Sequence, residues 1–298
     1  MNVLKDKRIG IFGKGGAGKS TFVVLLAKGL SDCGYEVCVL DADSTNVGLH
    51  QAMGLDESPA PLMEYYGGTV FSGGAVTCPV DDPTSLPEAD VFLDELPQKY
   101  HVENREGISL LVAGKIGGQG PGAGCDGPVS KIARDLKIHR RGKQLVTLVD
   151  FKAGIEDSAR GVITGLDWAI VVVDPTNASI QMAVDMTHMV DQIRDGVLPA
   201  TGHLEDPKLV EAANRVFREA NVKGVLCVLN RVEDKEMEKY MRRRLKEKEI
   251  EPIMAIHEDP SIAISWLEGT PLDGTTARKD TQSVIRELEA VEEVRSAR

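Results

Sequence analysis

Seven short runs of apolar, often β-branched residues recur along the chain and determine its predicted architecture. They are RIGIF at 8–12, EVCVLD at 36–41, ISLLVAG at 108–114, LVTLVD at 145–150, WAIVVVD at 168–174, GVLCVLN at 224–230 and PIMAI at 252–256. Helical periodicity or a long polar segment separates most neighbouring runs, which is typical of parallel strands joined by crossover helices. We therefore predict an α/β fold with a mainly parallel central sheet of about seven to eight strands and helices on both faces.

The first two runs enclose a predicted helix. The segment from Ser20 to Cys33 repeats apolar residues at helical spacing, and Gly34 follows where a helix stop is expected. The apolar positions are Val23, Leu26, Ala27 and Leu30. This part of the chain is predicted to be a strand, loop, helix, strand unit.

The whole chain, 1–298, is predicted to form one domain with two insertions. Residues 56–107 hold several Pro and Gly residues around one or two short helices, and residues 195–207 form a shorter interruption before a charged helix. We expect both insertions to lie at the surface.

The composition of the chain argues against some classes of function. The 298 residues carry 35 Lys and Arg against 46 Asp and Glu, a formal net charge of −11. This balance argues against a surface built mainly for nucleic acid or anionic lipid, although local basic patches remain open. No leader-like segment or membrane-length apolar run is present, so we expect a cytoplasmic protein. Two of the five cysteines, Cys38 and Cys227, lie within apolar runs and are interpreted as reduced core residues.

The first run leads into GKGGAGKST, which fits the phosphate-loop pattern G-x-x-x-x-G-K-(S/T) between a buried strand and an amphipathic helix. Glycines allow backbone N–H groups to surround phosphates, Lys19 supplies a charge to the β and γ oxygens, and the Ser20 hydroxyl is a ligand for Mg²⁺. The strand and helix on either side disfavour a chance match. The predicted nucleotide-binding residues of the loop are Gly13, Lys14, Gly15, Gly16, Ala17, Gly18, Lys19, Ser20 and Thr21.

The additional lysine, Lys14, makes this stretch resemble the deviant loop KGGxGK(S/T) of the family of MinD, ParA, the arsenite-pump ATPase, the nitrogenase iron protein and the CooC nickel-insertion ATPases. The resemblance implies a Mg²⁺-dependent ATPase that forms a homodimer when ATP binds. It further implies that Lys14 reaches the phosphates held by the partner subunit, where it joins Lys19 as a catalytic residue.

Acidic residues follow the second and fourth runs. Asp41 and Asp43 resemble the first switch of the family, which implies that Asp43 orients or deprotonates the attacking water and that Asp41 and Asp43 help to hold Mg²⁺. The alternative is a pair of solvated loop aspartates. After the fourth run, DFKAGIE resembles the CooC form of the second switch. There Asp150 would be a Mg²⁺ carboxylate and the N–H of Gly154 would sense the γ-phosphate.

The sixth run ends in Asn230 and Arg231, where the resemblance implies contacts with the adenine base. On the residue alone, an Asn that caps the strand end is an equal alternative. His257, after the seventh run, is interpreted as a residue at the rim of the base pocket.

Two helical segments help to distinguish which members of the family this chain resembles. The last helix combines an apolar stripe with four glutamates, so we expect it to pack on its own core, unlike the basic membrane helix of MinD. The basic run 239–246 is interpreted as the solvated face of a helix anchored by Met241 and Leu245, and a ParA-like grip on DNA is the alternative.

Cys125 lies in the stretch GAGCDGP, which is preceded by VAGKI. This arrangement resembles the C-x-C-P metal motif of CooC, but Gly127 replaces the second cysteine. It also resembles the first cluster loop of the nitrogenase iron protein, whose second cluster cysteine has no counterpart in residues 150–165. We expect a Zn²⁺ or Ni²⁺ site at the dimer interface, built from Cys125 and Asp126 of both chains, and an unliganded loop thiol is the alternative.

The sequence thus favours an ATP-dependent homodimeric maturation or metal-insertion factor for a metalloenzyme client. The expected partners include neither membrane nor nucleic acid. The two alternatives are a ParA- or MinD-like positioning ATPase and an iron-protein-like electron donor.

Overall fold

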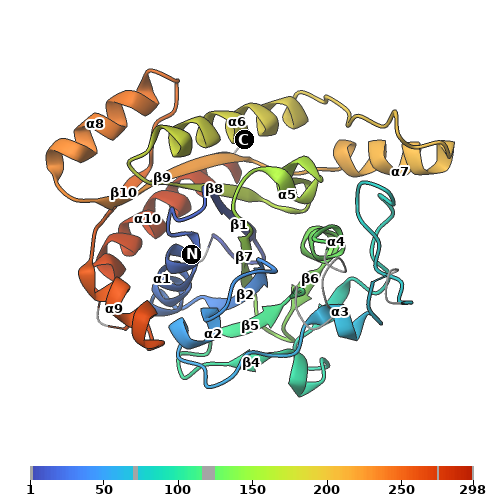
Figure 1. Cartoon of the computed structure of the whole chain (residues 1–298), viewed down its shortest axis with the longest axis horizontal. Coiled ribbons are helices and arrows are strands. Elements are labelled where there is room, and N and C mark those ends of the chain that lie inside the picture. Colours follow the sequence, from blue (N-terminus) through green and yellow to red (C-terminus); the bar gives the residue numbers. More distant parts are fainter. Residues whose placement is uncertain (1–2, 70–72, 116–124, 274, 297–298) are drawn as a thin grey trace.

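A single eight-stranded sheet runs through the centre of the molecule (Figure 1). The computed structural model describes residues 3–69, 73–115, 125–273 and 275–296. The strand order is β10-β9-β8-β1-β7-β2-β5-β4, and all neighbours are parallel except β4 and β5. The strands are β1 (Arg8–Gly13), β2 (Glu36–Ala42), β4 (Val102–Glu103), β5 (Ser109–Val112), β7 (Leu145–Phe151), β8 (Trp168–Val173), β9 (Gly224–Val232) and β10 (Met254–His257).

The seven apolar runs are the seven parallel strands, which confirms the predicted fold class. Three further strands are too short to produce an apolar run: β4, at the edge of the main sheet, and the pair β3 (Asp90–Phe92) and β6 (Lys137–His139), which forms a separate two-stranded sheet. Each has only two or three residues, and β3 alternates exposed and buried positions. The sequence analysis did not predict them.

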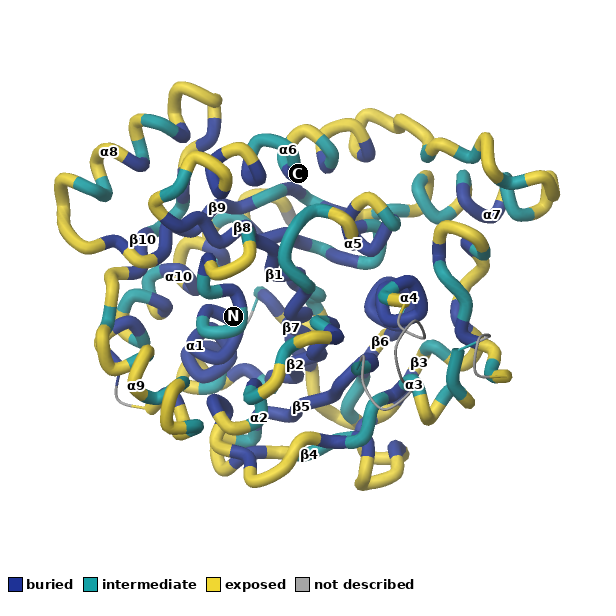
Figure 2. The backbone as a smooth tube through the Cα atoms, viewed as in Figure 1, coloured by how far each residue is buried: buried dark blue, intermediate teal, exposed yellow. Residues whose placement is uncertain are grey.

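Helices cover both faces of the sheet, so the strands are the most deeply buried part of the chain (Figure 2). On one face lie α1 (Lys19–Asp32), α2 (Leu49–Ala52), α9 (Pro260–Glu268) and α10 (Ala277–Ser296). On the other lie α3 (Leu62–Tyr65), α4 (Gly127–Asp135), α6 (Asn177–Arg194) and α8 (Lys235–Lys246). Shorter or peripheral elements are η2 (Gln98–Tyr100), α5 (Glu156–Ala159), η3 (Val162–Gly165) and α7 (Pro207–Arg218).

The predicted first crossover helix is α1, which ends at Asp32 with Gly34 in a left-handed conformation (φ 83°) directly after it. The last helix, α10, buries Val284, Ile285 and Leu288 completely against α1 and the sheet. It therefore packs on the fold, as its apolar stripe predicted.

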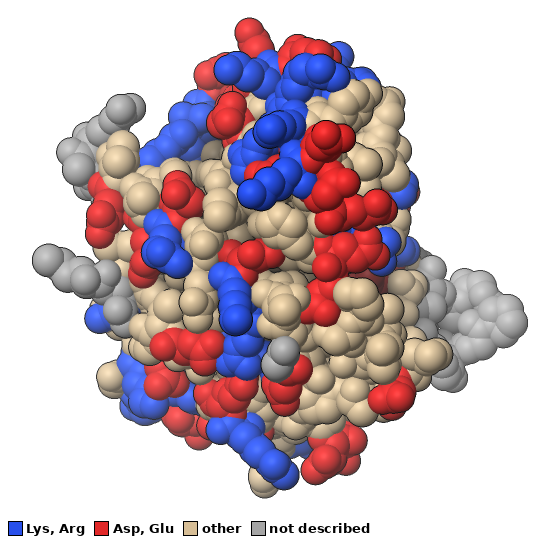
Figure 3. Space-filling model, turned by 90° about the vertical axis from the view of Figure 1, so that its left-hand side faces the viewer, with Lys and Arg blue, Asp and Glu red and all other residues tan. Residues whose placement is uncertain are grey.

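The basic run on α8 is anchored by Met241 and Leu245, which are both buried. Several of its arginines have acidic partners: Arg242 pairs with Glu238 at 2.8 Å, and Arg244 lies 3.4 Å from Glu247. Basic and acidic side chains are interspersed over this side of the molecule (Figure 3). Within the described residues, no helix combines the length and apolar character that crossing a bilayer requires.

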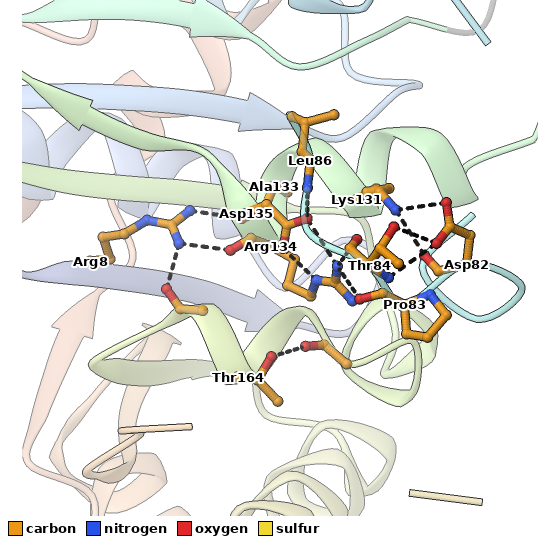
Figure 4. Close-up of polar contacts among 12 residues, drawn as sticks. Arg8, Asp82, Pro83, Thr84, Leu86, Lys131, Ala133, Arg134, Asp135 and Thr164 are labelled. Atoms are coloured by element: carbon orange, nitrogen blue, oxygen red, sulfur yellow. Dashed lines mark hydrogen bonds and ion pairs between the residues drawn. The ribbon is translucent and has the colours of Figure 1, made fainter. Parts of the chain in front are cut away.

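The described residues of segment 56–107 pack against the core of the domain and are also bound to it by hydrogen bonds. It buries a set of apolar side chains in the same core as α4 and α6: Leu62, Val76, Leu86, Val91, Leu93, Leu96 and Tyr100. Two buried basic residues of α4 hold its backbone. Lys131 donates to the carbonyl of Asp82 at 2.8 Å, and Arg134 donates to the carbonyls of Pro83 and Thr84 at 3.1 Å (Figure 4).

Arg8 connects β1 to the carboxyl end of α4, where carbonyl groups lack helical partners. Its guanidinium donates to the carbonyls of Ala133 at 2.7 Å and Arg134 at 3.0 Å, and also to the carbonyl of Gly165 (Figure 4). Burial lowers the pKa of Arg8 to about 10, so the side chain keeps its charge at neutral pH. A cation at this helix end also interacts favourably with the helix dipole.

We expect Arg8→Met to lower the free energy of unfolding by about 2–4 kcal/mol, because several buried carbonyls lose a charged donor. Arg8→Lys should lose less, since it keeps the charge but not the planar fork. Urea denaturation measures both. The exposed Arg105 provides the control: Arg105→Met should change stability by no more than about 0.5 kcal/mol. Equal stability of Arg8→Met and Arg105→Met would contradict this role.

Candidate nucleotide-binding site

The phosphate loop connects the carboxyl end of β1, near the middle of the sheet, to the start of α1. Gly18 has a left-handed conformation (φ 90°), and a Cβ at this position would come within 2.3 Å of the Nδ2 atom of Asn230. Lys19, the first residue of α1, is buried beneath the loop with 7% of its surface exposed. The loop thus has the backbone shape and the single buried lysine of a phosphate site.

Asn230, near the end of β9, stabilises this loop through a hydrogen bond. Its Nδ2 atom donates to the carbonyl of Ala17 at 2.8 Å, and the side chain is buried. This contact gives Asn230 a structural role that the sequence interpretation did not include, and its contact with adenine stays a prediction. Arg231, the other residue expected near the base, is exposed and has a positive φ of 55°.

Helix α9 lies beside the loop through Trp266, whose indole Nε1 donates to the Thr21 hydroxyl at 2.9 Å. His257 precedes this helix and has a partner that the sequence did not reveal. The Nδ1 atom and the backbone N–H of His257 lie 3.0 Å and 2.9 Å from the same carboxylate oxygen of Asp280 on α10.

Asp150 lies at the end of β7, fully buried and beside the loop. Its Oδ1 atom has no hydrogen-bond partner among the described residues, and its Oδ2 atom is 3.4 Å from the amide of Asn46. The same amide donates to the Ser20 hydroxyl at 3.1 Å. Burial, followed by the neighbouring charge of Asp41, raises the pKa of Asp150 to about 7.

This environment fits Mg²⁺, which takes hard oxygen ligands and usually keeps several waters. The orphaned carboxylate oxygen of Asp150 and the Ser20 hydroxyl are the groups that would hold the ion. The charge of the cation would offset the burial that now disfavours the ionised carboxylate. The structure therefore brings Ser20 and Asp150 together as the sequence analysis expected.

Asp41 is the register partner of Asp150 on the adjacent strand, β2, and it is also buried. Its carboxylate lies 2.6 Å from the Nζ atom of Lys115, which also donates to the carbonyl of Asp43 at 2.7 Å. Burial outweighs the attraction of Lys115 and raises the pKa of Asp41 to about 6. The sequence analysis gave Lys115 no role, because its pairing with Asp41 arises from the adjacency of β2 and β5.

One carboxylate oxygen of Asp43 is engaged in a local turn. The Oδ1 atom accepts hydrogen bonds from the backbone N–H and the hydroxyl of Thr45, at 2.9 Å and 2.7 Å. In this turn an aspartate satisfies the backbone two residues ahead. The assignment of Asp43 to water activation and Mg²⁺ binding stays a prediction.

The Lys14 side chain lies beside an acidic residue of the same chain. Its Nζ atom lies 3.8 Å from Oδ2 of Asp174, at the end of β8, and 39% of the Lys14 side chain is exposed. The other oxygen of Asp174 accepts from the hydroxyls of Thr176 and Ser179, which fixes the carboxylate. Gly154 is likewise engaged within the chain, since its N–H donates to the carbonyl of Gly13 at 3.2 Å.

Asp126, which precedes α4, contacts both segments that follow the acidic strands. Its Oδ2 atom lies 2.5 Å from Nζ of Lys152, two residues after Asp150, and its Oδ1 atom accepts from the hydroxyl of Ser44. The neighbouring residue, Cys125, is an exposed free thiol. The preceding residues, 116–124, which include most of the glycine-rich approach to Cys125, lie outside the described residues.

Comparison with known proteins places these features in a family. Residues 11–272 match the model of the CobQ/CobB/MinD/ParA nucleotide binding domain. An uncharacterised ATP-binding protein of Methanocaldococcus jannaschii is 33% identical over 224 residues, which cover 74% of this chain and 87% of that protein. The carbon monoxide dehydrogenase accessory protein CooC of Rhodospirillum rubrum is 32% identical over 185 residues, or 60% of this chain and 67% of CooC.

Solved structures share the fold at lower sequence identity. The septum site-determining protein MinD of Pyrococcus horikoshii, complexed with Mg-ADP, has a TM-score of 0.58 and 17% identity, covering 97% of this chain and 98% of that one. MinD in the MinC:MinD complex of Aquifex aeolicus has a TM-score of 0.59 and 19% identity, covering 95% and 96%. The chain has the same architecture over almost its entire length.

We expect Asp150→Asn to weaken the Mg²⁺ dependence of nucleotide binding, because the amide removes the charge and one oxygen from the site. Titration of Mg²⁺ at fixed ADP, followed by calorimetry, measures the effect. Asp56→Asn, at an exposed position, is the matched control. An unchanged Mg²⁺ dependence in Asp150→Asn would remove this residue from the metal site.

Proposed function

The chain belongs to the CobQ/CobB/MinD/ParA nucleotide-binding family, and from this premise we propose that it is a cytoplasmic, Mg²⁺-dependent ATP hydrolase that acts as a homodimer. We further propose that its ATP cycle serves the maturation of, or metal insertion into, a metalloenzyme client. The loop, the buried Asp150 and the family's ATP-binding members support the ATPase part.

The observation that carries the maturation role is the connection made by Asp126. Its carboxylate links the segment after Asp43, through Ser44, to the segment after Asp150, through Lys152. Both segments flank the nucleotide, so a change in its phosphates that moves either one also moves Asp126. Because Cys125 is the adjacent residue, nucleotide state is coupled to the position of an exposed thiol.

Similarity to CooC indicates the kind of client. The relative in Rhodospirillum rubrum is an accessory protein of carbon monoxide dehydrogenase. By this likeness, the partner of the present chain is a metalloenzyme whose centre is assembled after folding. The client is bound by the dimer in its ATP-bound form and released after hydrolysis.

The two alternatives have less support from the described surface. A positioning ATPase of the ParA or MinD type needs a grip on DNA or membrane, but Arg242 and Arg244 of α8 pair with acidic residues and α10 is packed on the core. An iron-protein-like electron donor has less support because residues 150–165 lack the second cluster cysteine of that family, and the Cys125 residues of two subunits alone supply two of the four thiolates that a [4Fe–4S] cluster usually takes.

We expect Lys14 to leave Asp174 when ATP brings two chains together and to bind the phosphates held by the partner. Lys14→Gln should therefore bind ATP almost normally and fail to dimerise, as measured by light scattering. Lys5→Gln, at an exposed position, should dimerise as the wild type does. ATP-dependent dimers of Lys14→Gln would contradict action across the interface.

Asp174→Asn tests the resting contact itself. The amide can retain the oxygen that accepts from Thr176 and Ser179 and replaces the one that faces Lys14. Losing this attraction should lower the ATP concentration needed for half-maximal dimerisation. If Asp174→Asn needs the same ATP concentration as the wild type for half-maximal dimerisation, the contact between Lys14 and Asp174 does not oppose dimerisation.

We expect Asp43→Asn to bind ATP and Mg²⁺ but to lose turnover, whereas Lys19→Ala should lose nucleotide binding. Phosphate release and calorimetry separate the two outcomes. Asp43→Asn that hydrolyses ATP at the wild-type rate would exclude Asp43 as the catalytic carboxylate.

The ATP-loaded Asp43→Asn variant is also the bait for the client, and Lys14→Gln is its matched control. The expected partner is a metalloenzyme in its metal-free form, retained by Asp43→Asn with ATP and not by Lys14→Gln. Activation of that purified apoenzyme by wild-type protein, ATP and metal tests the role directly. DNA or anionic vesicles retained in place of a metalloenzyme would favour a positioning ATPase.

A further inference from the structure

Two thiols from distant parts of the sequence meet at the first residue of α4. The Sγ atom of Cys125 accepts a hydrogen bond from the backbone N–H of Gly127 at 3.4 Å. On the same residue, a Cβ would come within 2.6 Å of the Sγ atom of Cys78 and within 2.7 Å of its Cβ. The Cys78 side chain thus occupies the space that a side chain at position 127 would fill, and both cysteines contact Gly127.

The environment of these cysteines differs from that of the core cysteines. Both are free; Cys125 is exposed and Cys78 is half-buried, whereas Cys38 and Cys227 are buried. The pair lies at the amino end of α4, a nine-residue helix. Two accessible thiols at such a position are suited to ligation, which structural cysteines in a core are not.

The segment that carries Cys78 is held in place relative to α4. The carbonyl of Cys78 accepts from the N–H of Asp82 at 2.9 Å, and the side chain of Asp82 accepts from the Thr77 hydroxyl at 2.9 Å. Lys131 on α4 in turn binds the carbonyl of Asp82 (Figure 4). The turn 78–82 is therefore fixed to the same helix whose first residue contacts both sulfurs, so the position of Cys78 relative to α4 is set by the fold.

We propose that Cys78 and Cys125 are the two protein ligands of a binding site for one thiophilic metal ion in each chain. Soft thiolates select ions such as Zn²⁺, Cd²⁺ or Cu⁺ over hard cations. Within the described ranges, no three His, Cys, Asp or Glu residues form a cluster suited to a metal. The remaining positions of a tetrahedral ion are therefore filled by water or by a second copy of the chain.

This ligand pair differs from the pair expected from the sequence, which combined Cys125 with Asp126. The carboxylate of Asp126 already binds Lys152 and Ser44, so a metal would have to compete with both. Cys78 needs no such exchange. Binding between Cys78 and Cys125 leaves Asp126 free to transmit changes from the nucleotide site. The thiol pair rests on geometry alone, and only its use in client maturation rests on the proposed function.

The test is a Cd²⁺ titration of the nucleotide-free, full-length protein, reduced with a phosphine and followed by sulfur-to-metal charge-transfer absorbance. The wild type should bind one ion per chain. Cys78→Ser and Cys125→Ser should each lower the affinity by more than the roughly 10- to 100-fold that loss of an outer-shell partner costs. Cys33→Ser removes another exposed free thiol and should leave the titration unchanged.

An exchange of residues tests the geometry in a second way. In the double variant Cys78→Gly with Gly127→Cys, the new thiol takes the space that the Cys78 side chain vacates, so Cd²⁺ binding should recover relative to Cys78→Ser. Gly127→Ala alone should weaken binding, because its methyl group displaces Cys78. Urea denaturation of each variant separates loss of ligation from loss of folding.

Cd²⁺ binding by Cys78→Ser equal to that of the wild type would overturn the site. Repeating the titration with ATP distinguishes the site from the proposed function. An affinity that changes with ATP supports coupling between the thiols and the nucleotide. An affinity that depends on both cysteines but not on ATP would establish the site and contradict the coupling.

Discussion

Two carboxylates buried on adjacent strands determine much of how this molecule is arranged. Asp41 and Asp150 are register partners on β2 and β7, and both are withdrawn from solvent at the edge of the sheet where the phosphate loop begins. Burial of like charges is costly unless cations or donors surround them. Lys115 provides one such cation to Asp41, while Asp150 retains an oxygen without a partner in the described part of the chain. The site is thus prepared for a metal-bound nucleotide that completes its charge balance.

Contacts at the same edge of the sheet connect the phosphate loop and the segments after β2 and β7 to Asp126. The segments after β2 and β7 both contact Asp126, and the N–H of Gly154 is held by the carbonyl of Gly13 in the phosphate loop. Under the proposed function, a ligand that draws either segment toward the phosphates would change the contacts of Asp126. Helix α4 begins directly after Asp126; its first residue contacts both cysteines and its carboxyl end is bound by Arg8.

This chain shares its fold more widely than its sequence. The fold is shared with MinD proteins, whereas the similarity in sequence is greater to CooC and to an ATP-binding protein of Methanocaldococcus jannaschii. Helix α10 is packed on the core, and Arg242 and Arg244 of α8 pair with acidic residues. Under the proposed function, Cys78 and Cys125 at the start of α4 would hold the metal that is delivered.

The amino-acid sequence by itself determined the sheet, the phosphate loop and the first crossover helix. Those features depend on local patterns: apolar runs in strands, glycines with special backbone angles and the spacing of one buried face. The resemblance to the family also assigned Ser20 and Asp150 to a Mg²⁺ site; the structure brings these two residues together through the amide of Asn46, and their metal role stays a prediction. The sequence could not predict the short edge strands, whose two or three residues carry too little apolar signal.

Only the tertiary structure decided which side chains meet across that edge. Lys115 reaches Asp41 and Lys14 faces Asp174 across neighbouring strands, and Asn230 supports Ala17 from β9, which β8 separates from β1. No local pattern encodes these contacts. The same is true of Cys78, which lies far from Cys125 in sequence and contacts Gly127 because segment 56–107 packs against α4. Sequence patterns report the environment of each residue along one element, whereas a site joins residues from several elements. Its composition is therefore determined by packing, and it becomes visible only when the chain is folded.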